Sequence, residues 1–122
     1  MARAYSKGRK DTDEEKLIKL MERYFIAVGK GEHETAGFDR KAAFRGKLYL
    51  VEIKTESKLN SYKIKNGKRI PLTQEQAAIE LLTNNEKDMR DWCKTHRVPY
   101  VIIYNEESIL NEFDIEILSN QN

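Results

Sequence analysis

The chain has 122 residues and a mass of 14.3 kDa, the size of a single domain. No apolar run approaches the roughly 20 residues that a membrane-spanning helix needs, and the basic N-terminus lacks the apolar stretch of a secretory signal. The single cysteine, Cys93, excludes a disulfide framework. We therefore expect a protein of the reducing cytoplasm that does not interact with membranes.

The charges are unevenly placed, although 22 basic and 20 acidic residues leave a net charge of only +2. Residues 1–10 and 57–73 contain bases and no acid, whereas residues 105–122 contain acids and no base. A short basic segment is either ordinary solvated surface or a surface that neutralises the phosphates of a nucleic acid. The candidate nucleic-acid contacts are Lys7, Arg9, Lys10, Lys58, Lys63, Lys65, Lys68 and Arg69.

Apolar residues at helical spacing predict a first helix from Thr12 to Val28. Thr12 and Glu15 have the spacing of a capping box at the start of this helix. Gly29 and Gly31 are expected to end it.

Two strands are predicted next, at 39–45 and 48–54, on either side of a turn at 45–47. The second strand is rich in β-branched and aromatic residues, as central strands are. Antiparallel pairing across the turn would place residue 40 opposite Glu52, so Asp39 would lie beside Glu52.

The segment 57–70 is polar and basic, and it is either a flexible loop or an extra β-ribbon. Thr73 and Gln76 predict the start of a second helix, whose register is unclear at 83–85. A third strand is expected at 99–104, followed by a short acidic strand or helix. The order α-β-β-α-β predicts an α/β or α+β fold, in which helices flank a mixed central sheet.

The two central strands bring together the residues that are best suited to catalysis or metal binding. Glu52 and Lys54 project from the same face of an otherwise apolar strand, and Asp39 is expected next to them. Adjacent carboxylates repel each other unless a cation lies between them, and Mg²⁺ binds one or two carboxylates, waters and phosphate oxygens. Asp39, Glu52 and the carbonyl of Ile53 are therefore candidate Mg²⁺ ligands, and Lys54 could orient a water for phosphodiester cleavage. The alternative is chance, because Glu/Lys pairs are common on solvated strand faces.

These residues resemble the PD-(D/E)xK nuclease superfamily, in particular its VRR-NUC nucleases and archaeal-type Holliday junction resolvases. The resemblance covers about residues 7–104. Phe38 replaces the proline of the motif, and the segment 57–70 is longer than its counterpart in these families. The matching features are Lys7-Gly8 ahead of a helix with Glu14, then Gly37-Phe38-Asp39, Val51-Glu52-Ile53-Lys54-Thr55 and Leu72-Thr73-Gln74-Glu75-Gln76.

The resemblance implies a restriction-endonuclease-like core, formed by one nuclease domain over residues 1–122. It implies that Asp39 and Glu52 bind the metal, that Lys54 activates or positions the water, and that Gln76 helps to place the water or the scissile phosphate. Glu14 would be an accessory metal ligand. The structural alternatives are a favourable helix-dipole position for Glu14 and ordinary helix capping for Gln76.

The function implied by the resemblance is that of a Mg²⁺-dependent endonuclease, with Mn²⁺ as a substitute. Its expected substrate is DNA, in particular branched DNA formed during recombination, repair or replication, and its expected assembly is a homodimer. Two alternatives remain open. One is a nicking or restriction-type nuclease with less selectivity for DNA structure, and the other is a DNA-binding protein that keeps the fold but does not cleave.

Overall fold

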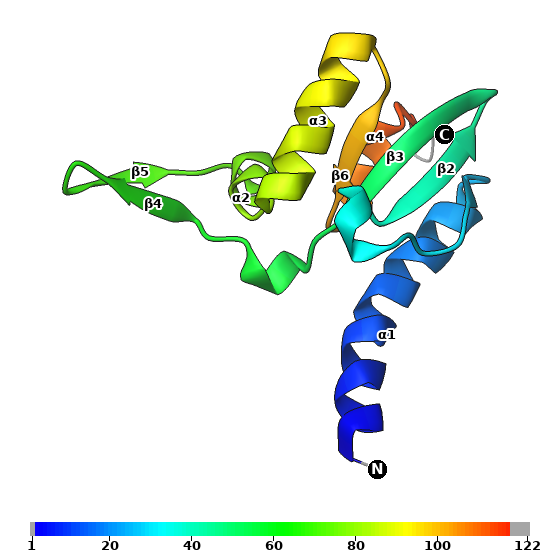
Figure 1. Cartoon of the computed structure of the whole chain (residues 1–122), viewed down its shortest axis with the longest axis horizontal. Helices are drawn as coiled ribbons and strands as arrows, with labels where there is room; N and C mark the ends of the chain where they lie inside the picture. Colours follow the sequence, from blue (N-terminus) through cyan, green and yellow to red (C-terminus); the bar gives the residue numbers. More distant parts are fainter. Residues whose placement is uncertain (1, 118–122) are drawn as a thin grey trace.

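A mixed sheet with helices on both of its faces forms the body of the protein in a computed structural model (Figure 1). The structure describes residues 2–117, with side chains from residue 13 onward. The mixed α/β character predicted from the sequence is confirmed. The elements are α1 (Ala2–Arg23), β1 (Ala27–Val28), the 3-10 helix η1 (Glu34–Ala36), β2 (Arg40–Phe44), β3 (Lys47–Ile53), the 3-10 helix η2 (Glu56–Lys58), β4 (Tyr62–Lys65), β5 (Lys68–Pro71), α2 (Gln74–Glu80), α3 (Asn84–His96), β6 (Tyr100–Ile103) and α4 (Glu106–Glu112).

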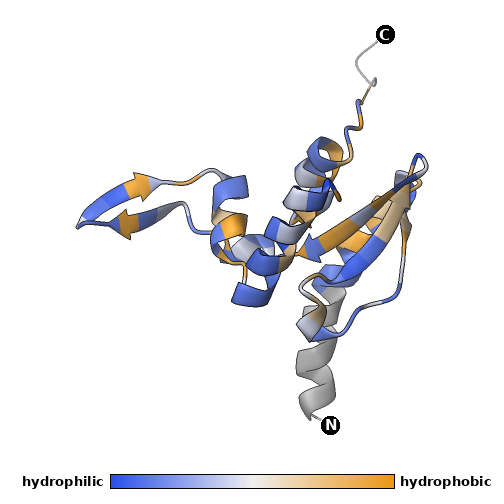
Figure 2. Cartoon of the chain, turned by 45° about the horizontal axis from the view of Figure 1, so that its top comes forward, coloured by the Kyte–Doolittle hydropathy of each residue, from blue (hydrophilic) through white to orange (hydrophobic). Residues whose placement is uncertain are grey.

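The main sheet has the strand order β1-β2-β3-β6, with β3 and β6 parallel and the other pairs antiparallel. Successive residues of β3 point to opposite faces. Val51 packs in a core that includes Met21 of α1 and Ile109 of α4, whereas Ile102 of β6, the partner of Glu52, packs against Ala78 of α2. Figure 2 shows hydrophobic residues gathered in this sheet. Glu52 therefore lies on the face that α2 and α3 cover.

The turn between β2 and β3 has two central residues rather than the three that we expected. Arg45 and Gly46 both have positive φ, of 53° and 76°, as a tight hairpin turn requires. The register therefore shifts by one residue, and Arg40 pairs with Val51 rather than lying opposite residue 52. Asp39 still lies beside Glu52, because it directly precedes the first residue of β2.

The predicted bounds of the first helix were wrong at both ends. The helix runs from Ala2 to Arg23, so Thr12 lies inside it and does not cap it. The residues before Thr12 are rich in Ala, Arg and Lys, which favour helix. Beyond Arg23 the chain reverses at Phe25, which has a φ of 66°, and Val28 belongs to a strand instead.

The elements after β3 agree with those predicted from the sequence. The segment 57–70 contains a β-ribbon, because β4 and β5 pair as a separate two-stranded hairpin. Thr73 and Gln76 form a complete capping box for α2, and the unclear register at 83–85 marks the break before α3. The acidic segment after β6 is helical. In the described part of the chain, no helix combines the length and apolarity needed to cross a membrane.

Gly37 lies between η1 and Asp39, just ahead of β2. We expect its replacement to lower the stability of the fold more than replacement of Gly46 does. Both glycines have positive φ, but a Cβ at Gly37 would lie 2.7 Å from the Met89 Cβ, whereas one at Gly46 would meet nothing within 4 Å. Gly46→Ala should cost about 1 kcal/mol of unfolding free energy through backbone strain alone, and Gly37→Ala about 2–4 kcal/mol. Urea unfolding of both variants tests this. Equal losses would show that the contact with α3 is unimportant.

Candidate active site

Glu52 lies near the C-terminal end of the central strand β3 and is only 3% exposed. Its Oε2 is 3.3 Å from the Nζ of Lys54. Its Oε1 is buried and has no hydrogen-bond partner among the described residues. A buried polar atom without a partner costs about 1–3 kcal/mol. The structure thus has a carboxyl oxygen that is aimed at no group of the described chain.

Asp39 is fixed to β3 by two hydrogen bonds. Its backbone N–H donates to the carbonyl of Val51 at 2.9 Å, and its Oδ2 accepts from the backbone N–H of Ile53 at 2.7 Å. The preceding segment is anchored as well, because the hydroxyl of Tyr100 on β6 donates to the carbonyl of Gly37 at 2.8 Å. These contacts hold the Asp39 carboxylate next to Glu52.

Lys54 is shared between Glu52 and a third carboxylate, Glu86, whose Oε1 lies 2.9 Å from the Lys54 Nζ. Glu86 occupies the third position of α3, and the same oxygen accepts from the backbone N–H of Thr83. The sequence analysis missed Glu86. Its only signal was the Thr83-x-x-Glu86 capping pattern, which helix capping explains without any role in a site.

The close packing of these carboxylates with one lysine alters their protonation. Burial and the neighbouring acids Asp39 and Glu86 raise the pKa of Glu52 to about 9, so Glu52 carries a proton at neutral pH. Burial also raises the pKa of Asp39. Burial is the largest influence on Lys54 and would lower its pKa, but the hydrogen bonds and negative charges of Glu86 and Glu52 together outweigh burial and raise the pKa. Burial is also the largest influence on Glu86 and would raise its pKa, yet the contacts with Lys54 and with the backbone N–H of Thr83 together leave the pKa lowered.

A cleft of ≈ 380 Å³ opens beside this cluster, between α1 and the C-terminal end of β3. Ligands of sheets with parallel strands commonly bind at such ends. Lys54 and Ile53 line the cleft from β3, and Glu14 lines it from α1. The Oε2 of Glu14 accepts hydrogen bonds from Arg40 at 2.9 and 3.2 Å, and the charge of Glu14 helps to raise the pKa of Asp39. Glu14 thus lies at the rim of the cleft, bound to Arg40.

Gln76 does not line the cleft. Its Oε1 accepts from the backbone N–H of Thr73 at 2.9 Å, which completes the capping box of α2. It borders a different hollow together with Lys63 and Glu80. The structure therefore shows the capping arrangement, and it does not bring Gln76 together with Asp39 and Glu52.

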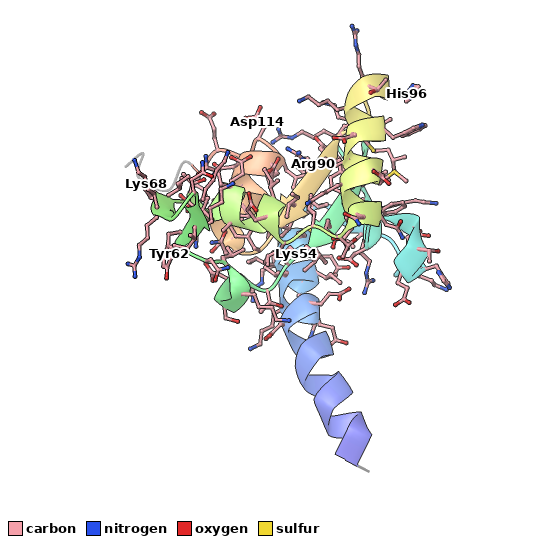
Figure 3. All side chains as sticks on the ribbon, turned by 60° about the vertical axis from the view of Figure 1, so that its left-hand side comes forward. Lys54, Tyr62, Lys68, Arg90, His96 and Asp114 are labelled. Atoms are coloured by element: carbon pink, nitrogen blue, oxygen red, sulfur yellow. The ribbon has the colours of Figure 1, made fainter. Side chains whose placement is uncertain are left out.

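The predicted nucleic-acid contacts on the β4–β5 hairpin lie away from the cleft. Figure 3 shows Lys54 near the middle of the molecule, whereas Lys68 lies out on the β4–β5 hairpin. Of the other hairpin residues, Lys63 is paired with Glu80 at 2.9 Å, Arg69 stacks on a tyrosine and Lys65 is exposed. Lys58 ends η2 and is exposed. The side chains of Lys7, Arg9 and Lys10 lie outside the described residues.

The chemistry of the cluster fits a hard divalent cation. Among the side chains described, no group of three or more His, Cys, Asp or Glu residues could hold a metal ion. Mg²⁺ needs only one or two carboxylates, since waters and substrate oxygens complete its shell. Asp39, Glu52 with its unpartnered oxygen, and the carbonyl of Ile53 are the groups that would hold it.

Comparison of the chain with protein-family models, with curated proteins and with solved structures finds no significant match. The function is therefore inferred from the residues of the site.

We expect Glu52→Gln to change the pH dependence of stability in the metal-free protein. The pKa of Glu52 is about 9 in the folded chain, above its ordinary value of 4.5, so the folded state keeps a proton that the unfolded state loses. The contribution of Glu52 is full below about pH 4.5 and declines as the pH rises to about 9, by at most about 1.4 kcal/mol per pH unit. Glutamine cannot ionise, so the variant should lack this decline.

Urea unfolding of the wild type and Glu52→Gln, with a chelator present, measures the difference between the two proteins across this range. The stability advantage of the variant should grow with pH and level off above about pH 9. Parallel pH profiles would contradict the raised pKa. Glu107→Gln, at an exposed residue of α4, is the matched control and should follow the wild type.

Proposed function

We propose that this chain is a metal-dependent nuclease that hydrolyses DNA phosphodiester bonds on a restriction-endonuclease-like core. The observation that carries the proposal is the buried Glu52 carboxyl. It has an unpartnered oxygen, lies beside Asp39 and Lys54, and is next to an open cleft. A solvated Glu/Lys pair would need neither this burial nor a second carboxylate held in place by the strand backbone.

Each residue of the cluster has a role in this reaction. Asp39, Glu52 and the carbonyl of Ile53 would bind Mg²⁺, for which Mn²⁺ would substitute. When bound, the cation would supply a Lewis acid and lower the pKa of the attacking water. Lys54 would orient that water and balance the negative charge that develops on the phosphate. Glu86 is a positioning residue, because it holds the Lys54 ammonium at the cleft.

Branched DNA as the preferred substrate and a homodimer as the active assembly are the finer parts of the proposal. Both come from the resemblance to junction resolvases. A less structure-selective nuclease would keep the same site chemistry. A DNA-binding protein that does not cleave would keep the fold without using the cation.

Cleavage of labelled DNA in the presence of Mg²⁺ tests the proposal. A four-way junction, a nicked duplex and a linear duplex should be compared under single-turnover conditions. Asp39→Asn should abolish cleavage, and Lys54→Ala should slow it at least about 100-fold, because each removes a group that acts in the transition state. Asp91→Asn, at an exposed carboxylate of α3, is the matched control and should cleave like the wild type.

The outcomes separate the candidate functions. Faster cleavage of the junction supports a resolvase, and equal cleavage of every DNA supports the less selective nuclease. Binding without cleavage by any divalent metal would support the non-cleaving DNA-binding protein. Normal cleavage by Asp39→Asn or Lys54→Ala would refute the assigned site. Sedimentation of the wild type tests the homodimer separately.

A further inference from the structure

The β4–β5 hairpin projects away from the body of the protein as a separate arm (Figure 1). Its strands are joined by Asn66 and Gly67, which have φ values of 54° and 76° and form a tight turn. An isolated two-stranded hairpin is at best marginally stable in water. The base of the arm is tied down, because Lys63 pairs with Glu80 of α2 at 2.9 Å.

One face of the arm carries unneutralised positive charge. Lys65 and Lys68 are directly paired across the two strands, and both are exposed. Like charges opposite each other destabilise a hairpin. Neither lysine has a salt bridge with a described residue. The tip of the arm is thus arranged unfavourably for the free protein and favourably for a bound anion.

The opposite face of the arm is apolar and aromatic. Tyr62 and Ile64 alternate with the lysines of β4 and are 40% and 61% exposed. Arg69 lies over the Tyr62 ring, with its Cζ 4.4 Å from the ring centroid. A hollow of ≈ 500 Å³ adjoins this face, and Asn60 and Ser61 contribute hydrogen-bonding groups to it.

We propose that the β4–β5 hairpin binds unpaired nucleotides of DNA, with Lys65 and Lys68 on the phosphates and the Tyr62–Ile64–Arg69 face against the bases. This inference rests on the proposed function and deepens it. Among branched DNAs, it makes those that contain a single-stranded segment the preferred substrate class of the nuclease.

The chemistry of both faces favours unpaired over paired DNA. Phosphate contacts alone would need only the lysines, and they would leave Tyr62 and Ile64 exposed to water. Single-strand sites combine positive charge with aromatic stacking surfaces, and an arginine stacked with an aromatic ring adds to such a surface. The bases of an intact duplex are stacked on one another, so their faces are not available to Tyr62.

The arm follows the cleft residue Lys54 closely in the chain. Only η2 and its flanking residues separate the arm from Lys54 in the chain. Figure 3 shows Tyr62 and Lys68 on the arm, to one side of Lys54. The arm therefore leaves the body a few residues after Lys54 in the chain, and its tip projects away from the cleft.

DNA binding without divalent metal tests the proposal while avoiding cleavage. Fluorescence anisotropy should be measured for an oligothymidine single strand, a blunt duplex, and the same duplex with an oligothymidine tail. We expect the wild type to bind the two DNAs with unpaired bases more tightly than the blunt duplex. Tyr62→Ser and Ile64→Ser should each weaken binding to them by about 5-fold or more and leave duplex binding nearly unchanged.

Substitution of the hairpin lysines should change DNA binding differently from substitution of Tyr62 or Ile64. Lys65→Gln combined with Lys68→Gln should weaken binding to all three DNAs and reduce the slope of log affinity against log salt by roughly one unit. The controls are Leu48→Ser, an exposed apolar residue of β3, and Lys94→Gln, an exposed base of α3. Both should bind like the wild type, and circular dichroism should show that every variant is folded.

Equal affinity for blunt and tailed duplex, or equal loss on both with Tyr62→Ser, would overturn the proposal in favour of groove binding. Hairpin variants that bind every DNA like the wild type would overturn it too. These results do not bear on the cleavage tests, so the proposed nuclease activity can be correct even if the hairpin does not bind unpaired nucleotides. Conversely, the protein could bind single strands in a Tyr62-dependent way and yet cleave no DNA. That result would refute the proposed nuclease activity and support the proposed role of the hairpin in binding unpaired nucleotides.

Discussion

Burial of a carboxyl group in the central strand removes Glu52 from water, and a lone carboxylate there would cost several kcal/mol. The surrounding chain reduces this cost in the free protein by two means. Lys54 lies 3.3 Å from one carboxyl oxygen, and the raised pKa keeps a proton on the group. The other oxygen, Oε1, is left without a partner among the described residues. The elements around β3 are arranged about this one group, and it accounts for the position of each of its charged neighbours.

The carboxylate neighbours Asp39 and Glu86 are held by the backbone, and Glu86 is also paired with Lys54. The Asp39 carboxylate is bonded to the N–H of Ile53, and Glu86 is bonded to the N–H of Thr83 at the start of α3. Gly37 allows η1 to lie against α3, because any side chain there would collide with Met89. The like charges therefore cannot move apart to relieve their repulsion. A cluster preorganised in this way keeps a site for positive charge, which a cation can fill without rearrangement of the chain.

The sequence predicted the part of the site that depends on strand periodicity. Alternation along β3 places Glu52 and Lys54 together, and the nearby turn brings Asp39 to them even though the register differs by one residue. Glu86 could not be predicted, because its contact depends on how α3 packs against the sheet, 32 residues from Lys54 along the chain. The extent of α1 was misjudged for a similar reason. Ile26 and Val28 continue the apolar spacing of the helix, but the chain has already reversed direction at Phe25.

The distribution of charge has a consequence for the proposed reaction. The cleft is lined by the carboxylates of Asp13, Glu14 and Glu56 as well as by Lys54, and the carboxylates of Asp39 and Glu86 lie close to Lys54. On the proposed function, these carboxylates repel the phosphates of DNA until a cation is bound. Attraction must then come from elsewhere in the chain, and residues 57–73 contain bases and no acid. On the proposed function, the hairpin supplies the affinity for the backbone and the carboxylates supply the metal-dependent chemistry. The hairpin and the carboxylate cluster remain separate because further lysines among the carboxylates, in addition to Lys54, would neutralise the charge that binds the cation. The small net charge of +2 conceals the separation of the basic segments 1–10 and 57–73 from the acids of the site and of residues 105–122.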